Sequence, residues 1–81
     1  MDKHYICVEE NVIDCRTTFN ILAVRHTWEE AVDVLSLCIS EAKAIAEEND
    51  YPVLMDSISE FDAGDEENHI TVYIKIINGK S

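Results

Sequence analysis

The chain has 81 residues, which is enough for one domain (residues 1–81) and too few for two. Seventeen Asp and Glu against six Lys and Arg give a formal net charge of -11. This charge repels nucleic acid, anionic membranes and free nucleotides within roughly a Debye length, about 8 Å at physiological salt, so basic proteins are the favoured partners.

Two strand-like regions precede the best helix signal. Residues 4–8 (HYICV) and 19–25 (FNILAVR) are rich in β-branched and aromatic residues, and they predict a hairpin. Residues 11–15 (NVIDC) extend one arm of this hairpin or the other. The pattern does not decide whether the region forms one bent strand or two.

A long amphipathic helix is predicted from residue 28 to about residue 48. Thr27 and Glu30 have the spacing of a capping box, in which each side chain accepts a hydrogen bond from the other residue's amide. Asn49 is the expected left-handed C-cap. The apolar residues repeat at helical spacing and form one stripe, widened on one side by Val34, Leu37 and Ala44: Trp28, Ala31, Val32, Leu35, Cys38, Ile39, Ala42, Ile45 and Ala46.

Two further strands are predicted after the helix. Residues 52–61 (PVLMDSISEF) indicate one strand, and residues 69–77 (HITVYIKII) alternate clearly. The acidic residues 62–68 between them are expected to form a hairpin loop, in which Gly64 supplies a permissive backbone. The order of elements is therefore ββαββ, or βαββ if the first hairpin is poorly formed.

These elements predict an α+β fold with two layers. An antiparallel sheet of three to four strands needs one face covered, and one long amphipathic helix can cover it. The other face of the sheet stays open, and Tyr73, Ile77 and Tyr5 are expected to lie there. An exposed apolar patch of this kind often marks a subunit or partner interface.

No motif in the sequence specifies a reaction, a metal or a cofactor. The Cys and His residues lack the two-to-four-residue ligand spacing of structural zinc sites, and the acidic loop does not fit the calcium-binding template. We therefore expect no enzyme activity, no metal and no cofactor. Cys7, Cys15 and Cys38 show no disulfide pattern and are expected to pack inside, and the N-terminus has no signal-peptide core. A cytoplasmic protein without a membrane span is expected.

The most unusual feature is a run of acids without bases. Residues 44–74 contain no Lys or Arg. Three of the acids follow the predicted end of the helix, where the helix dipole makes carboxylates mildly destabilising. A sequence tuned only for stability would place Lys there. The run contains nine acids: Glu47, Glu48, Asp50, Asp56, Glu60, Asp62, Asp65, Glu66 and Glu67.

In size, acidity and compact α+β build, the chain resembles the small inhibitors that phages and mobile elements make against host nucleases. These are anti-CRISPR and anti-restriction proteins of the nucleic-acid-mimic type, and general properties of the whole chain, not a motif, carry the resemblance. It implies a non-catalytic protein that blocks a basic, nucleic-acid-binding surface of a larger protein, such as a CRISPR effector or host nuclease. The nine acids are the expected contact residues, because carboxylates on a small rigid surface can imitate phosphates.

Three other interpretations stay open. The acidity can serve solubility alone. The chain can instead be a structural or regulatory module that forms a homodimer through its open sheet face, using Tyr73, Ile77 and Tyr5. A small-ligand binder is the third, although the sequence shows no convergent set of polar residues for it.

Overall fold

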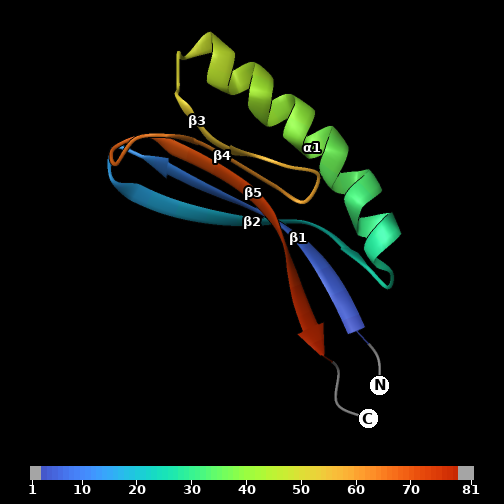
Figure 1. Cartoon of the computed structure of the whole chain (residues 1–81). Helices are drawn as coiled ribbons and strands as arrows, with labels where there is room; N and C mark the ends of the chain where they lie inside the picture. The colour runs from blue at the N-terminus through green and yellow to red at the C-terminus, as the bar shows by residue number, and fades with distance from the viewer. Residues whose placement is uncertain (1–2, 79–81) are drawn as a thin grey trace.

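The computed structural model describes residues 3–78 and has two layers: one helix lies over one face of an antiparallel sheet (Figure 1). The α+β class and the single long helix are confirmed, but the sheet has five strands, not three to four. Its spatial order is β2-β1-β5-β4-β3. The elements in chain order are β1 (Lys3–Ile13), β2 (Arg16–Arg25), α1 (Trp28–Glu48), β3 (Val53–Asp56), β4 (Glu60–Gly64) and β5 (His69–Asn78).

The extra strand arises where residues 52–61 were expected to run straight. The chain turns back after Asp56, and the amide of Ser57 donates to the carbonyl of Glu60 at 2.8 Å. The Ser57 hydroxyl accepts from the amide of Ser59 at 3.3 Å, which closes the turn further. The sequence pattern did not predict this serine turn, because the strands on both sides of it are rich in apolar residues. β4 then continues to Gly64, so Asp62 lies in a strand and not in the predicted loop.

The first hairpin forms completely. Residues 11–13 extend its first arm, and a two-residue turn at Asp14 and Cys15 joins the strands. Both turn residues have positive φ angles, 50° and 66°, which a type I′ hairpin turn requires. The prediction that Cys15 packs inside is therefore wrong: its side chain is exposed at the tip of the hairpin.

The helix begins at the predicted residue and is capped by Thr27, whose hydroxyl accepts from the Glu30 amide at 3.2 Å. The second half of the capping box differs from the expectation. The Glu30 carboxylate accepts from the Thr27 hydroxyl at 2.9 Å. At the other end Asn49 has φ -102°, and the left-handed residue is Asp50, with φ 56°.

A single core joins the two layers. Strand alternation places its sheet residues on one face, and three of the five helix positions are alanine, which lets the helix approach closely. The helical stripe is narrower than predicted, since Leu37 is 70% exposed and Trp28 and Ile45 are exposed too. The core consists of Cys7, Ala31, Leu35, Ile39, Ala42, Ala46, Phe61, Ala63, Ile70 and Val72.

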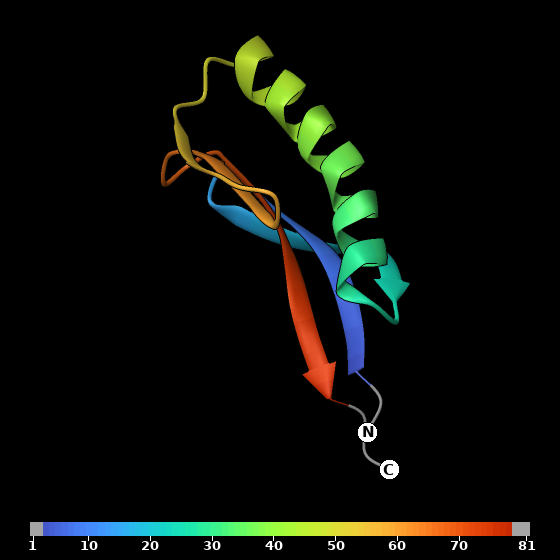
Figure 2. The same ribbon diagram turned by 45° about the vertical axis from the view of Figure 1, so that its right-hand side comes forward.

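The helix covers only part of its face of the sheet. Figure 2 shows that it begins beside the end of β2 and ends near the start of β3. The hairpin-tip half of β1 and β2 carries polar side chains on the helix-side register: the carboxylate of Glu9 accepts from the amide groups of Asn11 and Asn20, at 2.8 and 3.4 Å. No helix within residues 3–78 combines the length and apolar character that a membrane crossing requires.

The β4–β5 hairpin depends on Gly64, which has φ 123°. A Cβ atom here would collide with the carbonyl oxygen of Asn68 and approach Cα of His69 to 2.6 Å. We predict that Gly64→Ala lowers the free energy of unfolding by about 2 kcal/mol or more, through strain and backbone collision. Urea denaturation measures it. The exposed helical control Ser40→Ala should change stability by less than about 0.5 kcal/mol. Equal effects of the two variants would contradict this turn geometry.

Candidate functional site

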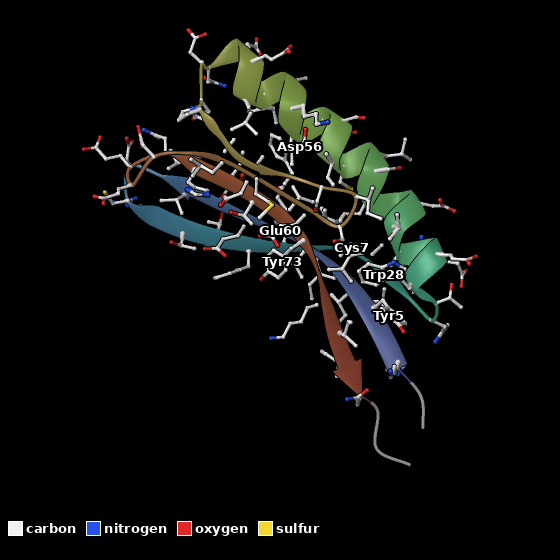
Figure 3. The ribbon with its side chains drawn as sticks, in the orientation of Figure 1. Tyr5, Cys7, Trp28, Asp56, Glu60 and Tyr73 are labelled. Carbon is white, nitrogen blue, oxygen red and sulfur yellow. The ribbon has the colours of Figure 1, made fainter. Side chains whose placement is uncertain are left out.

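The fold divides the nine acids among four places. Glu60 and Asp62 flank the buried Phe61, so strand alternation points them away from the helix. Asp56 pairs with Phe61 in the β3–β4 register and lies on the helix side. Figure 3 shows Asp56 close to the helix, and Glu60 beside Tyr73 on the sheet. The remaining acids lie at the helix C-terminal end (Glu47, Glu48, Asp50) and in the β4–β5 loop (Asp65, Glu66, Glu67).

A groove lies between the C-terminal half of α1 and β3. Its volume is about 520 Å³, and it combines apolar walls with three carboxylates and a single amine. A second hollow of about 470 Å³ shares Lys43 and Asp56 with it, so these two residues stand at the junction of one longer groove. We call the first hollow the acidic groove; it is lined by Lys43, Ala46, Glu47, Asp50, Tyr51, Val53, Asp56 and Phe61.

Lys43 and Asp56 form an ion pair across the groove. The Lys43 Nζ and Asp56 Oδ2 atoms are 3.0 Å apart, and the side chains are 48% and 44% exposed. A pair this exposed contributes only about 0.2–1 kcal/mol to stability. It is the one Lys or Arg pair with a carboxylate in residues 3–78. The other acids in the groove therefore have no cation to neutralise them there.

The end of α1 holds its acids in a defined backbone geometry. The Tyr51 amide donates to the Ala46 carbonyl at 2.8 Å, and the Asp50 amide donates to the Glu47 carbonyl at 3.3 Å. This is the Schellman arrangement, with Asp50 in the left-handed position that glycine usually takes. An L-residue costs about 1 kcal/mol in this conformation. The last turn contains no basic residue. The end of α1 thus lacks both the glycine that the left-handed position favours and the lysine that the helix dipole favours.

The β4–β5 loop uses one of its acids to build the turn. Oδ1 of Asp65 accepts from the amides of Glu67 and Asn68, each at 2.9 Å. These bonds, that from Asn68 first, lower the pKa of the Asp65 carboxyl. A lowered folded-state pKa means that the stabilisation is present at neutral pH and is lost as pH falls through that pKa. Asp65 therefore has a structural role, whereas Glu66 and Glu67 are exposed.

The two acids on the open face are partly buried, whereas the other seven are exposed. Oδ1 of Asp62 is a hydrogen-bond partner of His69 Nε2 and also accepts from the Thr71 hydroxyl at 3.0 Å. Its side chain is only a quarter exposed. Glu60 stands opposite Tyr73 in the β4–β5 register and is partly buried. The fold does not gather these two with the acidic groove, although the sequence placed all nine in one run.

The three residues expected on the open face do not all lie there. Ile77 pairs with His4, and Tyr73 with Val8, on the face away from the helix. Tyr5 pairs with Ile76 on the helix side instead. Its ring meets the Trp28 ring edge-on, with centroids 6.0 Å apart (Figure 3). Strand parity decides this, because Tyr5 and the buried Cys7 are two residues apart.

The cysteines differ strongly in exposure. Burial raises the pKa of the Cys7 thiol, with a smaller opposing effect of Arg25, and burial also raises the pKa of Cys38. Cys7 Sγ lies 3.5 Å from the Ala31 carbonyl oxygen and packs in the core. Within residues 3–78 no three His, Cys, Asp or Glu side chains stand together as a metal site would need.

Comparisons of the chain with protein-family models, curated proteins and solved structures found no match. Charge and geometry are therefore what the functional inference rests on. Sequence reasoning found the acids, but it missed the apolar residues Tyr51, Val53 and Phe61 that complete the groove. The only sequence signal for the groove was the nearness of Tyr51 and Val53 to the helix end; nothing local pointed to Phe61, eight residues further on.

The acids at the end of α1 oppose the helix dipole. We predict that Glu48→Lys raises the free energy of unfolding by about 0.3–1 kcal/mol at low ionic strength. Glu29→Lys, the matched control in the first turn, should lower it by a similar amount, since a cation is unfavourable at a helix N-terminus. Thermal and urea denaturation of both variants measure the difference. Shifts of equal sign and size would show that only net charge matters.

Thiol labelling tests the exposure of the cysteines. We predict that Cys15 is alkylated first at neutral pH, because it is exposed and the other two thiols are shielded and have raised pKa values. Fragmentation mass spectrometry of tryptic peptides over time gives the order, because Cys7 and Cys15 share the tryptic peptide of residues 4–16. Cys7 should react only under denaturing conditions. Labelling of Cys7 before Cys15 in the native protein would contradict the packing around Ala31.

Proposed function

We propose that this protein is a non-catalytic interaction protein that binds and blocks a basic, nucleic-acid-binding surface of a larger protein. The observation that carries the proposal is the acidic groove, where carboxylates stand over apolar walls on a rigid helix end. Lys and Arg side chains match such a groove, because their aliphatic stems pack on apolar surface while their charged ends meet carboxylates. Net charge favours the same partner.

The Lys43–Asp56 pair supports this assignment from within the chain. It shows that a lysine side chain fits the groove with its amine 3.0 Å from a carboxylate oxygen. A partner's Lys or Arg would meet Glu47 and Asp50 in the same way. Within residues 3–78, Glu47 and Asp50 form no ion pair, so pairing with a partner's Lys or Arg breaks no existing one. Long-range attraction between the two proteins would also raise the association rate.

A nuclease or CRISPR effector is the partner class that fits best. Its nucleic-acid channel is lined by Lys and Arg, and the acids of this chain would occupy the positions of phosphates. The exposed loop acids Glu66 and Glu67 would add a second contact. The protein would then compete with nucleic acid for the channel, and no chemistry by this chain is needed.

The test is competition on a panel of purified CRISPR effectors and nucleases with fluorescent nucleic acid bound. We expect the chain to displace the nucleic acid from at least one of them, with affinity that falls as salt rises. The variant Glu47→Lys/Asp50→Lys should weaken displacement by about tenfold to a hundredfold, as loss of close charge pairs does. The variant Lys43→Gln should strengthen it, because it releases Asp56.

The control is Glu29→Lys/Asp33→Lys, which makes the same change in net charge at the other end of α1. It should weaken displacement much less than the groove variant. Glu66→Lys/Glu67→Lys tests the loop separately, and Asp65 is left intact because its carboxylate closes the turn. Equal losses in the groove variant and the control, or no displacement from any member of the panel, would refute the proposal.

A further inference from the structure

The two edges of the sheet are built in opposite ways. β3 is only four residues long, follows Pro52, carries Asp56 and has an irregular register between Val53 and Met55. Proline, a charge, shortness and irregularity are the features by which proteins protect a sheet edge from pairing. β2, the other edge, has ten residues and no proline; its only charges are the arginines at its two ends, and it has one irregularity near Leu22.

β2 is also apolar where it should meet water. Phe19 is 63% exposed and Ile21 is 69% exposed, and Val24 is nearly half exposed. All three share the open face, since they pair with Glu10, Val8 and Ile6 of β1. The strand pairs with β1 on one side only, so its outer backbone groups have no sheet partner within residues 3–78.

The charge of β2 is exceptional in this chain. It has an arginine at each end and no carboxylate, although the net charge of the protein is -11. The helix and strands β1, β3 and β4 all carry acids; β5 also has none, but it lies in the middle of the sheet. β2 is thus the one exposed strand edge where two copies of this acidic chain can approach with little repulsion.

We propose that β2 pairs with β2 of a second copy, forming one continuous ten-stranded antiparallel sheet. The two-fold axis stands perpendicular to the sheet, so both open faces lie on the same side and the Phe19 and Ile21 side chains of the copies join. Antiparallel pairing places the start of one strand beside the end of the other. Arg16 of each copy therefore lies near Arg25 of the other, and Asp14, which precedes β2, approaches the same Arg25 and offsets this repulsion at both ends.

This pairing is independent of the proposed inhibitory function. The acidic groove borders β3, at the opposite edge of the sheet, and would remain open in the dimer. The two interactions also respond oppositely to salt. Salt screens the repulsion between two acidic chains and strengthens the dimer, whereas it weakens ionic binding to a basic partner.

The experiment is sedimentation equilibrium from low micromolar to near-millimolar protein. We expect the wild-type mass to rise from 9.2 kDa towards twice this value. Ile21→Lys should raise the dissociation constant roughly a hundredfold, because a two-fold symmetric interface contains the substituted residue twice. Leu37→Lys is the matched control, with the same exposure on α1, and should behave as wild type. Ile77→Glu should also leave the dimer intact if β2, not the centre of the open face, is the interface.

Hydrogen exchange on the wild-type chain supplies a measurement that needs no variant. Amides of β2 should exchange more slowly at high concentration than at low concentration, and those of β3 should not change. A wild-type mass of 9.2 kDa over the whole range would overturn the proposal. So would a dimer that survives Ile21→Lys with native circular dichroism, that is lost in Ile77→Glu, or that shows no protection of β2.

Discussion

One 21-residue helix has to cover a sheet of five strands, and the rest of the structure follows from how little it can cover. Its buried stripe of alanine, leucine and isoleucine meets Phe61, Val72 and Cys7, which are fully buried. A chain of this size buries only about 60% of its unfolded surface, so this contact has to supply most of the hydrophobic stabilisation. The opposite face of the sheet and the edge strand β2 are left outside it.

The small area that one helix can cover also explains where the charged side chains lie. Within residues 3–78, no carboxylate belongs to the core and no charged side chain is buried. They lie along the helix, in the turns and on β1, β3 and β4, while β2 and β5 have none. Of the two edge strands, β3 therefore carries an acid and β2 carries none. A dimer through β2 would present two acidic grooves at its far ends, and two such sites on one particle bind a paired or repetitive target more tightly than one.

The C-terminal end of α1 departs from local stability preferences. Asp50 occupies a left-handed position, and Glu47 and Glu48 face the negative end of the helix dipole. In contrast, the first turn follows the local preferences, with a Thr27 cap and acids at the positive end. The departures are thus confined to the end that borders the groove. A small domain has few kilocalories to spare, so unfavourable local choices at one place point to a use for that surface.

Prediction from sequence succeeded where neighbours along the chain decide the outcome. The Thr27 cap, the helix length and the Gly64 hairpin rest on hydrogen bonds and backbone angles within a few residues. It was wrong where a short local feature competed with composition: the Ser57 turn divides a β-rich segment, and Asp50 takes the left-handed position expected of Asn49. It also misplaced Tyr5 and Asp62, because the face of a strand residue depends on register across the sheet.

By itself, the sequence determined the α+β class, the amphipathic helix, the hairpin tip and the excess of acid, since periodicity, caps and charge are properties of contiguous residues. Only the tertiary structure decided which carboxylates stand together. The run of nine acids divides into a set at the helix end and the groove, a set in the β4–β5 loop, and two partly buried acids on the opposite face, because successive strand residues point to opposite sides of the sheet. The groove itself needs Phe61 from β4 as well as Lys43 from α1, and only long-range packing brings both residues into one lining.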